Sequence, residues 1–366
     1  MIEGRKMRRL IISNTHYQTI VALQLKLTLF KEDDVVFLVS DHSNGSKELV
    51  ERFNRIKLFE DVNYIQTKDI IHNNTKKGEW KDFFCFSFFN KNRYFFYLKD
   101  IKNHYFDEII VYNFNFDIYG LYSILSSVNP HIKVSMMEEG ILSYKKVQPF
   151  PKKLALSGKI REQLGKKNMN DAAGCYYCFY PCLYDGKYRP VQIPLIHPKS
   201  EIVAILKEVF DVHEQDLHYD RKYIFFASVF DFEGGTPIGE FELVKQIADT
   251  VGKDNLLIKI HPRDQRTIYR DNGFTVDKNS SVPWEVIQLS HDFSNHVFLT
   301  ATSGSVLSGN FLTDIPVRTY YLFKLCNVNG SAAKNIVQEI YNLLRNDDVK
   351  EIFRSVHIAE SVKEIL

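Results

Sequence analysis

The chain has 366 residues, 45% of them hydrophobic, and its 47 Lys and Arg nearly balance its 45 Asp and Glu. This length is enough for two domains with separate cores, and the composition excludes an intrinsically disordered chain. Because the charges balance, the sequence has no overall basic field of the kind that binds nucleic acid, so nucleic acid is not a predicted partner.

The first residues suggest where the natural chain begins. Residues 1–5 read MIEGR, which resembles a protease recognition site added for expression, so we expect the natural start at Met7. No apolar run approaches the length of a membrane span, and no apolar signal core follows the start. We therefore expect a cytoplasmic protein.

The first half of the chain alternates strands and helices. An apolar strand at residues 9–13 is followed by a polar turn at 14–18 and by residues 19–30, which are apolar at helical spacing. The same alternation predicts strands at 34–40, 108–112 and 131–137, a helix ending near 59 and a helix at 119–128. It indicates a Rossmann-like α/β domain over residues 7–185, and the Pro- and Gly-rich residues 180–194 are predicted to connect it to a second domain.

The second half repeats the alternation. Strands are predicted at 223–228, 255–260 and 297–301, with a helix at 240–251. These elements predict a second Rossmann-like domain over residues 195–330. Residues 331–366 are predicted to form helices at 332–344 and 349–356 that pack at the domain junction. Two successive α/β domains predict two sheets that face each other across a cleft.

Residues 82–105 are dense in Phe and Tyr with interleaved Lys and Arg. This composition suits a membrane surface or a platform for stacked bases. We favour a simpler interpretation, a pair of helices that face the core, and keep peripheral membrane association as the alternative.

Three of the five cysteines, Cys175, Cys178 and Cys182, lie close together in the sequence. Thiolates at such spacing can share a zinc ion. No second pair and no nearby histidine follows them, so we expect buried cysteines and no bound metal.

A strand end in the second half offers a candidate phosphate contact. His261 follows the strand at 255–260 and precedes Pro262, which makes the chain leave the strand in an extended conformation. An imidazole in this position can donate to a phosphate oxygen, and Lys259 adds positive potential. A histidine with a purely structural role is the alternative.

A cluster of hydroxyls follows the strand at 297–301. Thr302, Ser303 and Ser305 lie at the expected start of a helix, where free backbone N–H groups and the helix dipole favour an anion. Because ligands bind at the carboxyl ends of parallel strands, this cluster and His261 predict a phosphate pocket. The same hydroxyls suit a helix cap, and both roles can coexist.

Two adjacent carboxylates, Glu138 and Glu139, follow the strand at 131–137 and precede Gly140. Neighbouring side chains on an extended chain point in opposite directions, so one carboxylate faces the cleft and the other has a structural role. A partly desolvated carboxylate is a credible general base for an alcohol, and a solvated turn is the alternative.

Two further positions suit a ligand. Residues 281–285, SVPWE, indicate the opening of a helix, and Glu285 either stabilises that helix or accepts hydrogen bonds from ribose hydroxyls. Gly234 and Gly235, after the strand at 223–228, would let the backbone approach a ligand or would simply form a turn.

Taken in chain order, these motifs resemble the three-motif pattern of bacterial sialyltransferases, which is an acidic pair with a glycine, a His-Pro pair and a Ser/Thr pair. The similarity is to glycosyltransferase family 52 and its relatives, which sialylate lipooligosaccharide and streptococcal capsule. The turn from Asn14 to Gln18 is similar to theirs as well. Here Glu138 stands where many relatives have aspartate, and Gly304 interrupts the two hydroxyl residues. The segments that carry the resemblance are Glu138-Glu139-Gly140, His261-Pro262 and Thr302-Ser303-Gly304-Ser305.

The resemblance implies the GT-B architecture and the transfer of sialic acid from CMP-sialic acid to a galactose-terminated glycan, with inversion. Glu138 would be the general base. His261 would bind the CMP phosphate and assist its departure, and Ser303 with Thr302 or Ser305 would bind the same phosphate.

The resemblance also assigns supporting residues. Glu285 would hold the ribose, and we add Lys259 and Gly235 to the donor site and Asn14 and Glu139 to the acceptor sugar. No Asp-x-Asp metal signature is present, and a single phosphate can be held without a metal, so we expect no cofactor besides the substrates.

Two other functions remain open at the level of sequence. The chain would also suit another GT-B glycosyltransferase with a CDP- or UDP-linked donor, or a non-catalytic protein that binds a nucleotide or a glycan. The acceptor, the linkage and the oligomeric state are not specified by these motifs.

Overall fold

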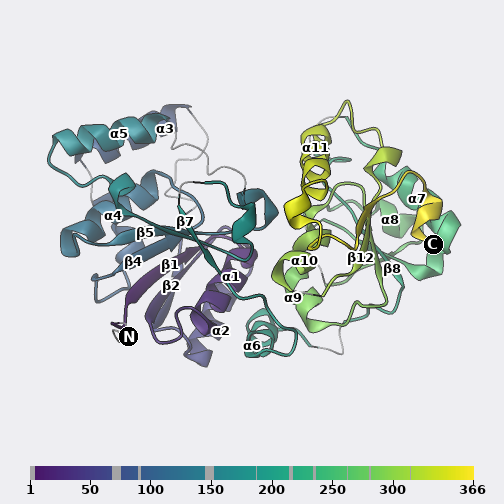
Figure 1. Cartoon of the computed structure of the whole chain (residues 1–366), viewed down its shortest axis with the longest axis horizontal. Helices are drawn as coiled ribbons and strands as arrows, with labels where there is room; N and C mark the ends of the chain where they lie inside the picture. The colour runs from purple at the N-terminus through teal and green to yellow at the C-terminus, as the bar shows by residue number, and fades with distance from the viewer. Residues whose placement is uncertain are drawn as a thin grey trace. The chain divides into compact units, whose positions relative to one another are not determined.

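The structure, a computed structural model, describes residues 5–67, 76–89, 92–144, 152–186, 188–213, 217–233, 236–261, 263–279, 282–313 and 315–366. The chain forms two compact units, Met1–Pro194 and Leu195–Leu366. Each unit contains one parallel β-sheet with helices packed against it (Figure 1). The prediction of an α/β fold is confirmed.

Unit 1 has a seven-stranded sheet in the order β3-β2-β1-β4-β5-β6-β7, with parallel pairing. This is the Rossmann order, in which the direction of chain progress across the sheet reverses between β1 and β4. Its strands are β1 (Arg8–Ser13), β2 (Asp34–Ser40), β3 (Asp61–Ile65), β4 (Glu108–Val111), β5 (Lys133–Met137), β6 (Ala173–Cys178) and β7 (Arg189–Gln192). Its helices are α1 (His16–Leu27), α2 (Ser46–Ile56), α3 (Lys76–Phe84), α4 (Phe116–Val128) and α5 (Lys152–Gln163), with a π-helical turn at Cys85–Phe89 and a 3-10 helix at Asn92–Leu98.

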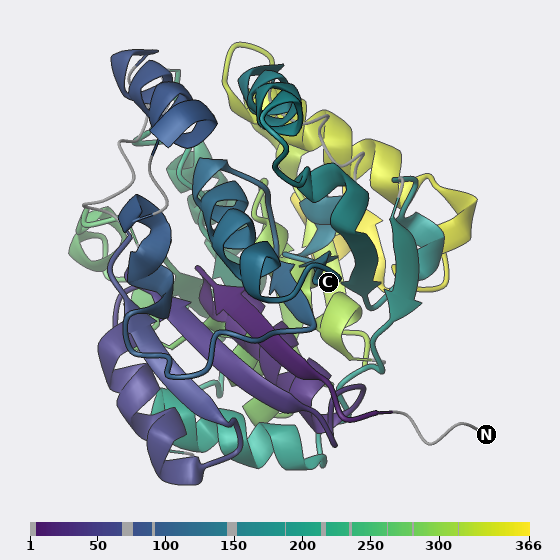
Figure 2. The same ribbon diagram turned by 90° about the vertical axis from the view of Figure 1, so that its left-hand side faces the viewer.

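Both faces of this sheet are buried, because successive apolar side chains along each strand point alternately to one face and the other. Leu10 and Ile12 of β1 pack in one cluster with residues of α4 and of the 3-10 helix. On the opposite face Phe37 of β2 stacks on Phe59 and meets Phe53 of α2 edge to face. Figure 2 shows α2, in purple, and α3, in blue, on opposite sides of the strands. The strands are therefore buried runs, and polar side chains are left to the strand ends.

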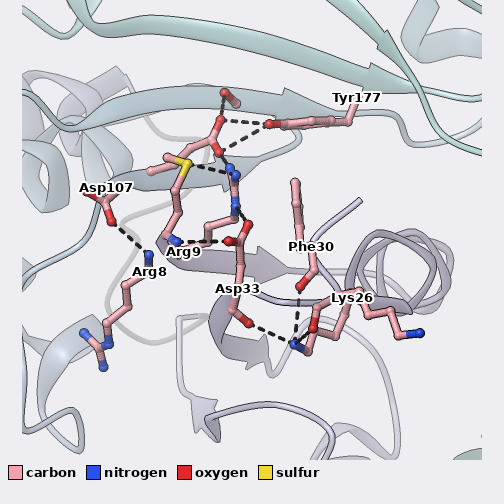
Figure 3. Close-up of polar contacts among 11 residues, drawn as sticks. Arg8, Arg9, Lys26, Phe30, Asp33, Asp107 and Tyr177 are labelled. Atoms are coloured by element: carbon pink, nitrogen blue, oxygen red, sulfur yellow. Dashed lines mark hydrogen bonds and ion pairs between the residues drawn. The ribbon is translucent and has the colours of Figure 1, made fainter. Parts of the chain in front are cut away.

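A buried polar cluster fixes the amino-terminal edge of the sheet (Figure 3). The guanidinium of Arg9 bonds to Asp33 at 2.7 Å and to the carboxylate of Glu108. The phenol of Tyr177 on β6 donates to the same Glu108 at 3.1 Å. Because the Arg9 guanidinium bonds to both carboxylates, neither of them is an isolated buried ion, and the cluster can lie inside the protein.

Unit 2 has a six-stranded sheet in the order β10-β9-β8-β11-β12-β13, again parallel and again in the Rossmann order. Its strands are β8 (Tyr223–Phe226), β9 (Leu256–Lys259), β10 (Thr275–Val276), β11 (Val297–Thr300), β12 (Arg318–Tyr321) and β13 (Val356–Ile358). Its helices are α6 (Glu201–Phe210), α7 (Glu240–Val251), α8 (Ile268–Asp271), α9 (Trp284–Ser290), α10 (Ser308–Leu312) and α11 (Ala333–Leu344).

Two local predictions were wrong. The predicted helix at 349–356 is instead a series of turns that leads into β13, the edge strand of the second sheet. The predicted connection at 180–194 contains β7, an edge strand that tolerates Pro190 because its backbone donor is not needed there. The hydroxyl cluster lies at the start of a helix, as predicted: a 3-10 turn at Gly304–Leu307 is followed by the short α10.

The aromatic stretch at 82–105 has both buried and exposed members. Phe83, Phe86 and Tyr97 are buried, as the core interpretation predicts. Phe84 and Phe88 are 55% and 45% exposed. Within the described residues, no helix combines the length and the apolar character needed to cross a bilayer.

Candidate functional site

The acidic pair lies at the carboxyl end of β5, and its two carboxylates have different surroundings. Glu138 has no exposed surface, and it accepts hydrogen bonds from the Tyr17 hydroxyl at 2.6 Å, from the Phe179 backbone N–H at 2.8 Å and from the Tyr144 hydroxyl. Burial raises the pKa of Glu138 to about 7, and these three donors limit the rise. A carboxylate with this pKa can take up a proton near neutral pH.

Glu139 is half-buried and lies beside the start of α1. Burial raises the pKa of Glu139, and a hydrogen bond from Thr15 partly offsets this effect. Thr15 also caps α1, because its hydroxyl accepts from the Gln18 backbone N–H at 3.3 Å. Neighbouring side chains on an extended chain point in opposite directions, and here Glu138 points into the interior while Glu139 lies nearer to solvent.

Gly140 explains the third position of the acidic motif. Its φ of +77° lies in the left-handed region that favours glycine. The turn directs the chain into a 3-10 turn at Ile141–Tyr144, which brings the Tyr144 hydroxyl back to Glu138. The glycine thus allows the turn that places the Tyr144 hydroxyl within hydrogen-bond distance of the buried Glu138 carboxylate.

Asn14 lies between β1 and α1, at the same edge of the sheet as the acidic pair. Its backbone N–H donates to the Gln18 side chain at 2.6 Å, and its carbonyl accepts from the Ser43 hydroxyl at 3.1 Å. Asn14 also lines a cavity together with residues that follow β4. The structure therefore brings Asn14, Glu138 and Glu139 to one edge of unit 1.

The hydroxyl cluster of unit 2 is shaped by Thr300, a residue that the sequence analysis did not select. The Thr300 hydroxyl donates to the Phe226 carbonyl at 2.9 Å and accepts from the backbone N–H groups of Thr302 at 3.2 Å and Ser303 at 2.8 Å. Those two N–H groups are thus occupied. Gly304 and Ser305, the first residues of the 3-10 turn, have N–H groups without an intrahelical acceptor.

The three hydroxyls of the cluster differ in access. Ser303 and Ser305 are half-buried, and their hydroxyl oxygens are 2.9 Å apart. Thr302 is 2% exposed, and its hydroxyl has no hydrogen-bond partner within the described part of the chain. Ser303 and Ser305 are therefore the hydroxyls that a phosphate could reach.

Glu285 is tied to the same region through α10. It lies in the first turn of α9, and its carboxylate accepts from the Ser308 hydroxyl at 2.8 Å. Ser308 directly follows the 3-10 turn of Ser305. A half-buried carboxylate held in this way keeps oxygen lone pairs for ribose hydroxyls.

His261 follows β9, which is separated from β11 by β8. Its Nδ1 accepts from the Arg263 backbone N–H at 3.2 Å, so the neutral imidazole carries its hydrogen on Nε2. Burial lowers the pKa of His261, and the charge of Arg263 lowers it further. The ring is therefore a neutral donor at pH 7, able to bond a phosphate oxygen through Nε2.

Two further residues, Lys259 and Gly235, were predicted to bind the nucleotide-sugar donor. Lys259 is paired with Asp277 at 2.9 Å and lies over the Trp284 ring, so its charge is already balanced. Gly235, its neighbour Gly234 and Pro262 lie outside the described residues.

The cysteine cluster does not form a metal site in the described chain. Cys175 and Cys178 lie three positions apart on β6, so their side chains project to opposite faces of the strand. Cys178 is buried, and burial raises the pKa of its thiol. Among the residues that the structure describes, no group of three His, Cys, Asp or Glu side chains could hold a metal ion.

A comparison with protein-family models identifies the family. The model described as alpha-2,8-polysialyltransferase (POLYST) matches residues 9–320. The chain belongs to this family. The sialyltransferase resemblance of the three motifs is thereby confirmed, and the polysialyltransferase family implies an enzyme that uses a nucleotide sugar and a glycan acceptor.

Several solved structures are similar to this polysialyltransferase-family chain at low identity. An alpha/beta-galactoside alpha-2,3-sialyltransferase from Photobacterium phosphoreum is 11% identical, with 99% of this chain and 100% of that chain covered and a TM-score of 0.49. A putative UDP-N-acetylglucosamine 2-epimerase from Listeria monocytogenes is 12% identical, with 96% and 92% covered and a TM-score of 0.44. MurG from Acinetobacter baumannii is 10% identical, with 98% and 88% covered and a TM-score of 0.43. No curated protein matches the sequence.

The order of strands in both units completes the fold assignment. Two successive Rossmann-like units are the composition of the GT-B class, so the predicted GT-B fold is confirmed. The predicted site residues fall into two sets, each at the carboxyl edge of one sheet. Unit 1 carries the carboxylates, and unit 2 carries His261, Glu285 and the hydroxyls.

Proposed function

We propose that the chain is a sialyltransferase that moves sialic acid from CMP-sialic acid to a hydroxyl of a galactose-terminated glycan, with inversion. The family match over residues 9–320 supports the sialyl transfer in this proposal, and the donor, the acceptor and inversion are what the motif resemblance implies. The two Rossmann-like units support it, because each presents its candidate residues at the sheet edge where such folds bind ligands.

Unit 2 would hold the donor. Ser303 and Ser305 present two hydroxyls 2.9 Å apart beside the unbonded N–H groups of a 3-10 turn, which suits one phosphate. The Nε2–H of His261 would donate to the same phosphate, and Glu285 would accept from the ribose. Hydrogen bonds that strengthen as charge develops on the departing CMP lower the barrier to its departure without a metal.

Unit 1 would remove the proton. The acceptor hydroxyl would give its proton to the Tyr17 oxygen while Tyr17 passes its own proton to Glu138, 2.6 Å away. The acceptor oxygen forms its bond to the anomeric carbon as the bond to the CMP oxygen breaks, so the anomeric centre inverts. This proposal requires that water is excluded from the substrates, because water would otherwise hydrolyse the donor.

A direct assay tests this function. CMP-sialic acid and a lactose-type acceptor should give a product one sialic acid heavier, and linkage analysis should show a single anomer opposite to that of the donor. Glu138→Gln should abolish transfer but keep the thermal stabilisation by CMP, and CMP should stabilise the protein more than CDP or UDP does. Equal stabilisation by UDP, with no sialylated product, would instead identify another glycosyltransferase.

We also propose that the enzyme works at the inner face of a bacterial membrane, in capsule or lipooligosaccharide synthesis. Trp80, Phe84 and Phe88 recur at every fourth position, so they share one side of α3 and its continuation, and they are 48%, 55% and 45% exposed. Lys81 is exposed on the same helix. Exposed aromatic rings beside a cation suit the headgroup region of an anionic bilayer.

Vesicle binding tests this localisation. The wild-type protein should sediment with vesicles that contain anionic phospholipid, and replacement of Trp80, Phe84 and Phe88 by serine should reduce the bound fraction at least about tenfold, because three aromatic contacts are lost. Phe95→Ser, at a separate exposed ring, serves as the control. Equal binding by the triple variant would refute the assignment.

A further inference from the structure

We infer that Tyr144 is a positioning residue for the proposed base, Glu138, because it holds the carboxylate in one orientation and leaves the other oxygen to Tyr17. This inference deepens the proposed function and rests on it. The two phenols contact different oxygens of the same carboxylate, since Tyr144 donates to Oε2 and Tyr17 donates to Oε1. They also differ in access, because Tyr144 is 3% exposed and Tyr17 is half-buried.

A second contact fixes the direction of the hydrogen bond from Tyr144 to Glu138. The Tyr180 backbone N–H donates to the Tyr144 oxygen at 3.1 Å. A backbone N–H can only donate, so the phenol accepts from Tyr180 and directs its own proton to Glu138. Because the Tyr144 side chain is also buried, it stabilises the ionised carboxylate and does not relay a proton from the substrate.

The turn that carries Tyr144 is braced by neighbouring side chains. The Tyr144 ring meets the Tyr176 ring edge to face, with centroids 6.1 Å apart, and the Tyr176 hydroxyl donates to the Ser143 hydroxyl at 2.9 Å. The Ser143 hydroxyl in turn accepts from the Glu139 backbone N–H at 2.9 Å and donates to the Gly140 carbonyl at 2.6 Å. The phenol is therefore held in place before any substrate binds.

The ionisable groups around Glu138 leave Tyr144 with a large share of its electrostatic environment. Burial raises the pKa of Glu138, and Tyr144 has the largest effect among the three donors that oppose this rise. On β6, burial raises the pKa of Tyr176 and of Cys178, and the charge of Glu138 adds to both effects, so both groups are neutral at pH 7. Burial also raises the pKa of the adjacent Glu139. Loss of the Tyr144 hydroxyl should therefore raise the pKa of Glu138 further.

Tyr144→Phe tests this role on the full chain. Carbon-13 NMR of the glutamate carboxyl groups measures the pH midpoint of Glu138, whose signal is identified by its absence in Glu138→Gln. The midpoint should move upward by about one pH unit, as the loss of one hydrogen bond to a charged group predicts. The pH profile of kcat/KM should show the same shift, while kcat at high pH should approach the wild-type value.

Tyr184→Phe is the matched control. Tyr184 is also buried, and its oxygen also accepts from a backbone N–H, that of Tyr188 at 3.2 Å. This variant loses the same kind of contact but no donor to Glu138, so the midpoint should stay at about 7. If Tyr144→Phe does not fold, 3-fluorotyrosine at position 144 keeps the ring and makes the phenol a stronger donor, so the midpoint should move downward.

The outcomes separate this inference from the proposed function. A midpoint that changes at position 144 leave unmoved, or a loss of kcat at every pH in Tyr144→Phe, would overturn the positioning role and leave sialyl transfer standing. A shifted midpoint in a protein that transfers no sialic acid would retain Tyr144 as the residue that keeps Glu138 ionised and would refute sialyl transfer.

Discussion

The hydroxyl of Tyr17 donates a 2.6 Å hydrogen bond to Oε1 of Glu138. Tyr17 lies in the first turn of α1, whereas Glu138 follows β5, so the bond joins the two elements that flank the carboxyl edge of the sheet. Tyr17 is half-buried and Glu138 is fully buried. A substrate would therefore meet the phenol before it met the carboxylate.

Tyr17→Phe should lower kcat by about 10²–10⁴-fold, because it removes the group that carries the proton to Glu138. The affinity for CMP should not change. Steady-state transfer kinetics, together with thermal shifts in CMP, check both statements. Tyr105→Phe, which removes a hydroxyl that accepts from Arg5 at the surface, should leave kcat unaltered.

Retention of kcat in Tyr17→Phe would mean that the proton reaches another group. Glu139→Gln then becomes the decisive variant, since Glu139 is the more accessible carboxylate of the pair. A loss of kcat in Glu139→Gln alone would move the general base from Glu138 to Glu139.

The pH dependence of transfer should report the buried carboxylate. Burial raises the pKa of Glu138 to about 7, and only the ionised form can accept a proton. The value of kcat/KM should therefore rise with pH and level off above about 7. A profile already flat from pH 5.5 to 8 would contradict Glu138 as the proton acceptor.

The same pKa predicts the pH dependence of stability. The folded protein holds the proton of Glu138 more tightly than the unfolded chain, whose ordinary value is 4.5, so the free energy of unfolding should fall as pH rises from 4.5 to about 7. Glu138→Gln should flatten this part of the curve. Its amide can still accept from the Phe179 N–H and donate to the Tyr17 oxygen. Urea unfolding at several pH values measures the difference.

The sequence predicted the strands that begin the two sheets, because buried parallel strands are continuous apolar runs. It missed β3, β6, β7, β10, β12 and β13. Four of these, β3, β7, β10 and β13, are edge strands, which are partly exposed and have a weak pattern; β7 even contains Pro190. The acidic motif was found, but not which carboxylate is buried. That outcome depends on Tyr144 and Phe179, which reach Glu138 only through the tertiary fold.

The hydroxyl cluster shows the same limit. The strand-end pattern and motif similarity selected Thr302, Ser303 and Ser305, which lie within four positions of the sequence. It did not select Thr300, because nothing in a strand-end threonine indicates that its hydroxyl will accept from two backbone N–H groups. The sequence pattern was enough to locate the loop. The hydrogen bonds of Thr300 that shape the loop could be identified only in the structure.

Thr300 and Thr302 provide a matched pair of Thr→Val variants. Thr300→Val leaves the N–H groups of Thr302 and Ser303 without their acceptor and should destabilise the fold by about 1–3 kcal/mol and weaken CMP binding. Thr302→Val removes a buried hydroxyl that has no partner in the described chain, so it should be neutral or stabilising. Thermal unfolding and CMP titration of both variants check the contrast. Equal losses in the two variants would show that Thr300 does not shape the turn.

The cluster of Arg9, Asp33, Glu108 and Tyr177 lies at the opposite edge of the sheet, and we expect it to contribute to the stability of the fold and not to catalysis. Arg9→Met leaves Glu108, which is 4% exposed, without its cation, and the free energy of unfolding should fall by about 3–5 kcal/mol. Lys324→Met, in an exposed pair with Glu360, should cost less than about 1 kcal/mol.

A second substitution separates charge from packing at Arg9. Glu108→Gln in the Arg9→Met background removes the uncompensated charge, so it should recover part of the lost stability, while Tyr177 can still donate to the amide oxygen. Because Arg9 and Glu108 lie at the amino-terminal ends of β1 and β4, far along the strands from Asn14 and Tyr112, kcat per folded molecule should remain at the wild-type level. Urea unfolding and activity measured below the unfolding midpoint check the two statements together. A fall in kcat without a fall in stability would place this cluster in the reaction instead of in the fold.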